Sequence, residues 1–130
     1  MKKLFILTMA LHLAMAGAVY AGGFEVQKKA GDYNVVVRID KNPPVVGNNN
    51  MEIEVRDSSG KSVPNAKIRV DYSMPAMSGM PAMNYKTDAA LTGGKYAAVL
   101  NIPMSGSWSV RVKITIGGKS STVKFNVGAE

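Results

Sequence analysis

The sequence contains no cysteine and a single histidine, His12. Thiol nucleophiles, Ser-His pairs and the usual Cys/His zinc sites all need these two residue types, so their scarcity excludes most catalytic designs. No disulfide can support the fold, which must therefore depend on a hydrophobic core. The few carboxylates fall at turns or outward strand positions beside Lys or Arg, and none is singled out for catalysis. The sequence predicts a protein that is not an enzyme.

The N-terminus has the pattern of an export signal. Lys2 and Lys3 precede a mostly apolar run over residues 4–19, and Ala21 follows as a small residue at the expected cleavage position. This order is typical of a signal peptide spanning residues 1–21, although an uncleaved membrane anchor is the alternative interpretation. We expect export to a bacterial periplasm, with residues 22–130 as the mature domain.

Apolar and polar residues alternate along almost the whole mature chain. In residues 34–40 the period of two puts Val35, Val37 and Ile39 on one face and the polar residues of the run on the other. Gly117-Gly118 separates two further alternating runs as a two-residue hairpin turn does. The other alternating runs cover residues 51–56, 67–72, 108–116 and 122–127, with shorter ones at 24–27 and 96–102. The pattern predicts one all-β domain, an antiparallel immunoglobulin-like β-sandwich of seven or eight strands.

Basic residues outnumber acidic ones, 16 to 9 over the whole chain. Two of the 16 are Lys2 and Lys3, and the rest are scattered over outward strand positions and turns, with Lys28-Lys29 as the only adjacent pair. This scatter predicts a solvated surface and argues against nucleic acid, although a basic surface could favour acidic partners or anionic lipid head groups. No later segment is apolar enough to span a bilayer, so we expect no stable membrane insertion after leader cleavage.

One segment departs from the strand pattern. Residues 74–83 contain two copies of Met-Pro-Ala-Met joined by Ser-Gly, which place methionines at positions 74, 77, 80 and 83. Thioether sulfur is a soft donor that selects Cu(I) over harder ions. It has no proton to lose, so it could bind copper at any envelope pH. The segment predicts a Cu(I) site made of Met74, Met77, Met80 and Met83.

The spacing of these methionines leaves two arrangements open. A β-turn or single helical turn in each Met-Pro-Ala-Met would bring its two sulfurs to one side, and Gly79 would let the two pairs face each other. A flat strand would put successive methionines on opposite faces, and a polyproline helix would space them too far apart for one ion. The hairpin-like arrangement predicts one site with two to four sulfurs. Adaptable protein contacts and simple packing are the alternative roles.

Two residues outside the segment could complete the site. Met104 lies in the turn before Trp108, and that turn could sit at the same end of the domain as residues 74–83. Trp108 could cap a bound cation with its ring, but it also begins an inward-facing series typical of a core tryptophan. Met51 begins another inward series and is expected in the core.

Several motifs occur in an order that resembles the YtkA-like domain, which is related to FixH. They are Tyr33–Val37, Pro43-Pro44, Val63–Ala66, the Met-Pro-x-Met segment, Gly94-Lys95-Tyr96 and the Met104–Trp108 turn. The resemblance covers about residues 32–127. It implies an exported or membrane-tethered β-sandwich that occurs beside copper-handling and efflux components, and FixH-like members are tied to assembly of copper-containing oxidases. The cleavable leader departs from FixH.

The sequence therefore predicts a periplasmic metallochaperone that carries or buffers Cu(I). Its expected ligands are Met74, Met77, Met80, Met83 and Met104, and its expected partner is an envelope protein of copper efflux or oxidase assembly. The competing hypothesis is a docking module without metal, whose methionine loop contacts a membrane complex.

Overall fold

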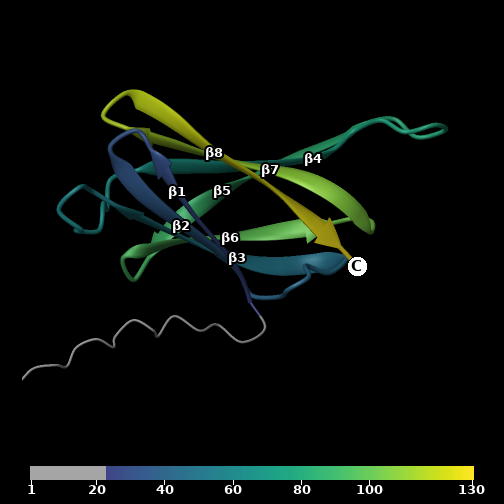
Figure 1. Cartoon of the computed structure of the whole chain (residues 1–130), viewed down its shortest axis with the longest axis horizontal. Helices are drawn as coiled ribbons and strands as arrows, with labels where there is room; N and C mark the ends of the chain where they lie inside the picture. Colours follow the sequence, from purple (N-terminus) through teal and green to yellow (C-terminus); the bar gives the residue numbers. More distant parts are fainter. Residues whose placement is uncertain (1–22) are drawn as a thin grey trace, which may run out of the picture.

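The computed structural model describes residues 23–130 as an all-β domain of eight strands (Figure 1). The strands are β1 (Phe24–Ala30), β2 (Tyr33–Ile39), β3 (Gly47–Arg56), β4 (Lys67–Met74), β5 (Met83–Thr92), β6 (Lys95–Ile102), β7 (Gly106–Ile116) and β8 (Lys119–Ala129). The predicted signal peptide and its cleavage position lie outside the described residues. No helix in residues 23–130 is long and apolar enough to cross a membrane.

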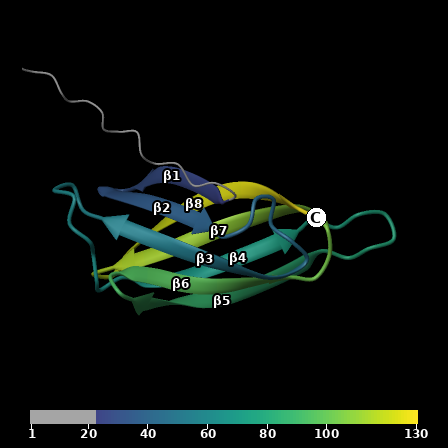
Figure 2. The ribbon, with the colours of Figure 1, turned by 90° about the horizontal axis from the view of Figure 1, so that it is seen from below.

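All neighbouring strands are antiparallel, in the order β1-β2-β3-β6-β5-β4-β7-β8. Strand β5 connects two layers, because its residues 83–89 pair with β4 and its residues 90–92 pair with β6 (Figure 2). We call β1, β2, β3 and β6 the first sheet, and β4, β7, β8 and residues 83–89 of β5 the second sheet. The prediction of an antiparallel all-β domain is confirmed, but the two layers form one continuous sheet folded over on itself.

The core lies between the two layers. It is built from the inward positions of the alternating runs, and Trp108 is its largest fully buried side chain. Met51 is also buried, as expected. At the ends of the folded sheet β1 lies against β8, where the Phe24 and Phe125 rings stack at 5.6 Å. Gly117 and Gly118 both adopt positive φ in the β7–β8 turn, which confirms the predicted hairpin.

Strand β5 is the element that the alternation did not indicate. The side chains of residues 84–86 are all exposed, since this part of β5 pairs with β4 but has left β6. A strand that passes from one layer to the other has no constant buried face, and its sequence therefore lacks the period of two.

Candidate metal-binding hairpin

The methionine segment is the far end of the β4–β5 hairpin. Met74 pairs with Met83, and Met77 pairs with Met80 through two backbone hydrogen bonds of 2.9 and 2.8 Å. The chain reverses at Ser78-Gly79, where Gly79 adopts a φ of +81°. The predicted hairpin is therefore present. The expected turn within each Met-Pro-Ala-Met is wrong, because both copies are extended and the methionines pair across the hairpin.

The hairpin register separates the four methionines into two pairs. The same register holds from Tyr72↔Tyr85 to Met77↔Met80, with no extra residue on either strand. Successive side chains therefore keep pointing to opposite faces of the hairpin up to its tip. Met74 is buried and Met83 is half-buried against the core, whereas Met77 is 49% exposed. An offset of three residues on an extended chain puts the pairs on opposite faces. The structure therefore does not bring all four together.

We call Met77 and Met80 the tip pair. They flank the two-residue turn that ends the hairpin, and both ribbon views show this end extending well beyond the rest of the domain (Figures 1 and 2). Directly opposed residues with two mutual hydrogen bonds have Cα atoms about 5.5 Å apart. Two flexible thioethers at that separation can approach the same ion.

We call Met74, Met83 and Met104 the inner cluster. The Met74 side chain covers Gly106: a Cβ added to that glycine would lie 2.6 Å from the Met74 Cε. Met104 is two residues earlier, half-buried against the same core, and its carbonyl accepts a 3.0 Å hydrogen bond from the Trp108 indole N–H. Met104 therefore lies at the same end of the domain as Met74 and Met83, as the sequence indicated.

Three aromatic side chains pack together next to the inner cluster. The rings of Tyr72 and Tyr85 stack at 5.6 Å, and each lies 6.1 Å from the Trp108 ring. Trp108 is fully buried and already has aromatic neighbours, which favours its interpretation as a core residue over a cap on a cation. The Tyr72 hydroxyl donates to the Asn101 carbonyl and accepts from the Asn101 N–H. It therefore provides hydrogen-bond partners for the backbone of β6 at a position where β5 no longer pairs with that strand.

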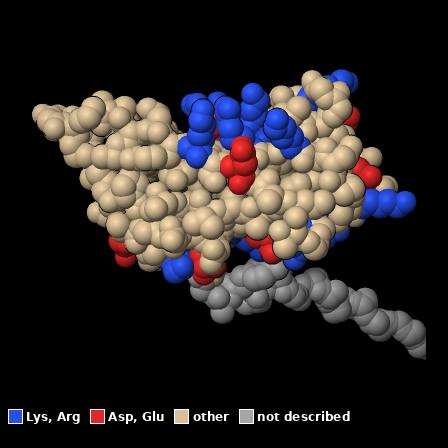
Figure 3. Space-filling view, turned by 180° about the vertical axis from the view of Figure 1, so that it is seen from behind, with Lys and Arg blue, Asp and Glu red and all other residues tan. Residues whose placement is uncertain are grey.

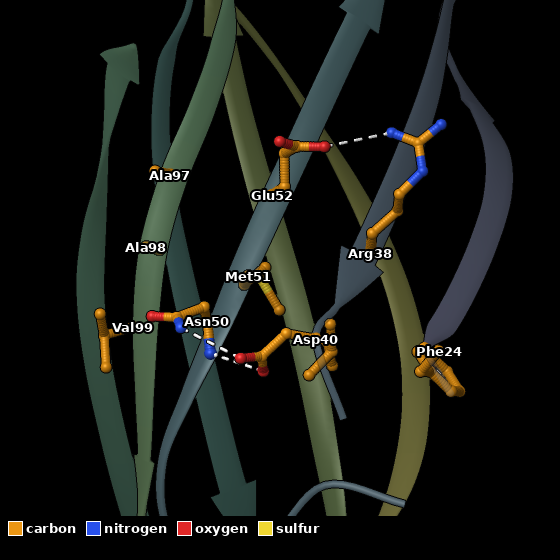
Figure 4. A pocket seen from close by; sticks show the side chains of 11 residues that line it. Phe24, Arg38, Asp40, Asn50, Met51, Glu52, Ala97, Ala98 and Val99 are labelled. Carbon is orange, nitrogen blue, oxygen red and sulfur yellow. Dashed lines mark hydrogen bonds and ion pairs between the residues drawn. The ribbon is translucent and has the colours of Figure 1, made fainter. Parts of the chain in front are cut away.

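A separate hollow lies on the outer side of the first sheet (Figure 4). Asp40 accepts two hydrogen bonds from Asn50, one from its backbone and one from its side chain, and Glu52 pairs with Arg38. Burial acts to raise the pKa of Asp40, but these bonds and Lys41 outweigh it and lower the pKa. The polar groups thus satisfy one another.

Glu54 is the most strongly held carboxylate of the first sheet. It pairs with Arg38 and Arg56, and its side chain is only 9% exposed. Burial acts to raise the pKa of Glu54, but the hydrogen bonds and charges of Arg38 and Arg56 lower it to about 2. Because the folded-state pKa lies below the ordinary value, this carboxylate stabilises the fold above pH 4.5, and the contribution is lost as the pH falls toward 2.

We expect Glu54→Gln to lower the free energy of unfolding by about 2 kcal/mol at neutral pH, since one pKa unit corresponds to about 1.4 kcal/mol and partial exposure screens some of it. Urea unfolding between pH 7 and pH 2 checks this. The difference from the wild type should shrink steadily as the pH falls. Glu52→Gln is the control, because Glu52 is 43% exposed and its removal should cost about 0.5 kcal/mol. Equal losses of stability in the two variants would contradict the stabilising role assigned to the Glu54 carboxylate.

In residues 23–130 no three His, Cys, Asp or Glu side chains gather to hold a metal ion. The thioethers of the hairpin and of Met104 are therefore the donor set to consider for a metal. All five predicted ligands lie on the hairpin or on the turn beside it. The hairpin register pairs Met74 with Met83 and Met77 with Met80, and Met104 lies two residues before the glycine that Met74 covers.

The sequence was compared with known protein families and curated proteins. Residues 27–113 match the sequence model of the family described as YtkA-like. No curated protein matches the sequence. The match spans most of the chain, from β1 through most of β7, and includes the methionine hairpin and Met104. The chain therefore belongs to the YtkA-like family.

Proposed function

We propose that this protein binds Cu(I) through methionine thioethers and carries or buffers it in the periplasm. The observation that supports this most strongly is the pairing of Met74 with Met83 beside the turn that holds Met104. Soft sulfur donors without competing hard ligands suit Cu(I) better than divalent ions. The export signal expected in residues 1–21 supports the periplasmic location.

The inner cluster is the proposed primary site. Its half-buried members, Met83 and Met104, flank a buried Met74, so an ion held there would be shielded from water and from oxidants. Shielding favours Cu(I), which needs few ligands and little hydration. The tip pair, with Met77 exposed, would serve as a second, two-sulfur site from which copper passes to an envelope partner of copper efflux or oxidase assembly.

Competition with a colorimetric Cu(I) chelator, under reducing and oxygen-free conditions, tests this proposal. We expect residues 22–130, which contain all eight strands, to remove Cu(I) stoichiometrically from the chelator. The variant with Met74, Met77, Met80, Met83 and Met104 all changed to Leu should remove none. Leu keeps most of the volume while deleting the sulfur. Failure of the wild type to compete even with a weak chelator would overturn the proposal.

The alternative function is a docking module that contacts a membrane complex through the hairpin. The exposure of Met77 at the projecting tip favours it, because flexible apolar side chains suit adaptable protein contacts. Docking depends on apolar bulk, so the leucine variant would retain it. Wild-type protein without copper affinity, together with a leucine variant that still binds its partner, would favour this alternative.

A further inference from the structure

Six of the 14 basic residues in residues 23–130 lie together in the folded protein. Strand order brings these six onto the outer face of the second sheet, on β4, β5, β7 and β8, all with exposed side chains. They are Lys67, Arg69, Lys86, Arg111, Lys113 and Lys124. The acidic residues at outward positions of these strands are Asp71 and Asp88. Figure 3 shows the Lys and Arg side chains gathered on this face. We call it the basic face.

The strand register places the six basic residues next to one another on this face. Arg69 on β4 lies opposite Lys113 on β7, and Arg111 on β7 lies opposite Lys124 on β8. Lys67, Arg69, Lys86 and Lys113 also line one hollow of the surface. The register also places Asp71 opposite Lys86 and Arg111, and Asp88 opposite Arg69, so the two acids offset only part of the repulsion between the six basic residues. A partner with negative charge would relieve the repulsion.

The two outer faces of the domain differ in how their charges are balanced. On the first sheet Arg38, Arg56 and Lys95 all form ion pairs with Glu25, Glu52 or Glu54. On the basic face Arg69 pairs with Asp71, and the other five cations have no acidic group within 4.0 Å among residues 23–130. Most positive charges on the outer face of the first sheet are thus paired with acids, whereas most of those on the basic face are not.

We propose that the basic face binds the surface of a bilayer containing anionic phospholipids. The other outward residues of these strands are mostly Ser, Thr and Asn, without the buried aromatic anchors that dominate protein–protein interfaces. A polar face with an excess of four positive charges complements a surface of phosphate head groups. The hairpin register also places the tip pair on the same side as Ser73 and Asn84, which belong to this face. Its exposed Met77 supplies an apolar contact at the edge of the face.

Sedimentation with lipid vesicles tests the proposal, using residues 22–130 without added copper. We expect binding to vesicles of phosphatidylglycerol and phosphatidylcholine but not to pure phosphatidylcholine. Each basic side chain near an anionic surface strengthens binding about fivefold, so Lys86→Gln with Lys113→Gln should weaken it about 25-fold. Added salt should weaken wild-type binding as well.

The matched control is Lys29→Gln with Lys61→Gln, which removes the same charge from exposed positions on β1 and on the β3–β4 connection. This variant should bind like the wild type. An equal loss in both variants would show an effect of net charge alone and overturn the proposal. Absence of wild-type binding to anionic vesicles would also overturn it, and an acidic protein would then be the ligand to seek.

Discussion

We expect that replacing Met74, Met83 and Met104 with leucine weakens Cu(I) binding strongly and leaves only the tip pair to hold the ion, whereas replacing Met77 and Met80 leaves most of the affinity. The reason is that the inner cluster has one buried and two half-buried methionines at one end of the domain, whereas the tip pair has only two thioethers at the projecting end of the hairpin, where Met77 is exposed. Changes in outer-shell partners alone cost on the order of 10- to 100-fold in metal affinity, so loss of the ligands themselves should cost about 100-fold or more.

Chelator competition by the two variants in parallel provides the measurement. Each substitution keeps most of the side-chain volume and should cost less than about 1.5 kcal/mol of stability. Far-ultraviolet circular dichroism shows whether both variants remain folded. The opposite outcome, in which the tip variant loses copper and the inner variant keeps it, would place the site at the exposed end of the hairpin.

We expect Trp108→Ala to lower the free energy of unfolding by about 4 kcal/mol, a larger loss of stability than that expected of Glu54→Gln. The side chain is fully buried, contacts the rings of Tyr72 and Tyr85, and donates to the Met104 carbonyl. Its removal would leave a large cavity and an unpaired carbonyl beneath the inner cluster. Such a loss is a large share of the total stability of a domain of this size.

Urea unfolding measures this effect. Trp108→Phe should cost less than Trp108→Ala, since it keeps an aromatic ring in the core and loses mainly the hydrogen bond to Met104. Met77→Ala is the control, because Met77 lies at the exposed tip and its truncation should change stability by about 0.5 kcal/mol or less. A Trp108→Ala variant within about 1 kcal/mol of the wild type would contradict the role of this residue in the core.

The strands and the core were largely predictable from the sequence. Val35, Val37 and Ile39 are buried and alternate with more exposed residues because one face of β2 meets the core, and the same holds for β3, β4, β7 and β8. Strand β5 was not predictable in this way, since it leaves one layer for the other and keeps no constant buried face. Local periodicity reports burial and carries no information about which strands become neighbours.

The candidate site was predicted in composition but only partly in geometry. The hairpin and the position of Met104 agree with the sequence, yet the separation of Met74 and Met83 from Met77 and Met80 depends on a register that continues through the two prolines. The basic face was missed for a related reason. Lys86 and Lys113 are distant in sequence and meet only because β5, β4 and β7 are adjacent.

X-ray absorption spectroscopy of the Cu(I)-loaded protein at the copper edge tests the central claim most directly, because it identifies the atoms bound to the metal. The account predicts a first shell of two or three sulfurs from thioethers, without nitrogen ligands, and loss of that sulfur shell in the variant with all five methionines changed to leucine. A shell dominated by nitrogen or oxygen in the wild type would contradict it, since the copper would then be held by groups other than the methionines.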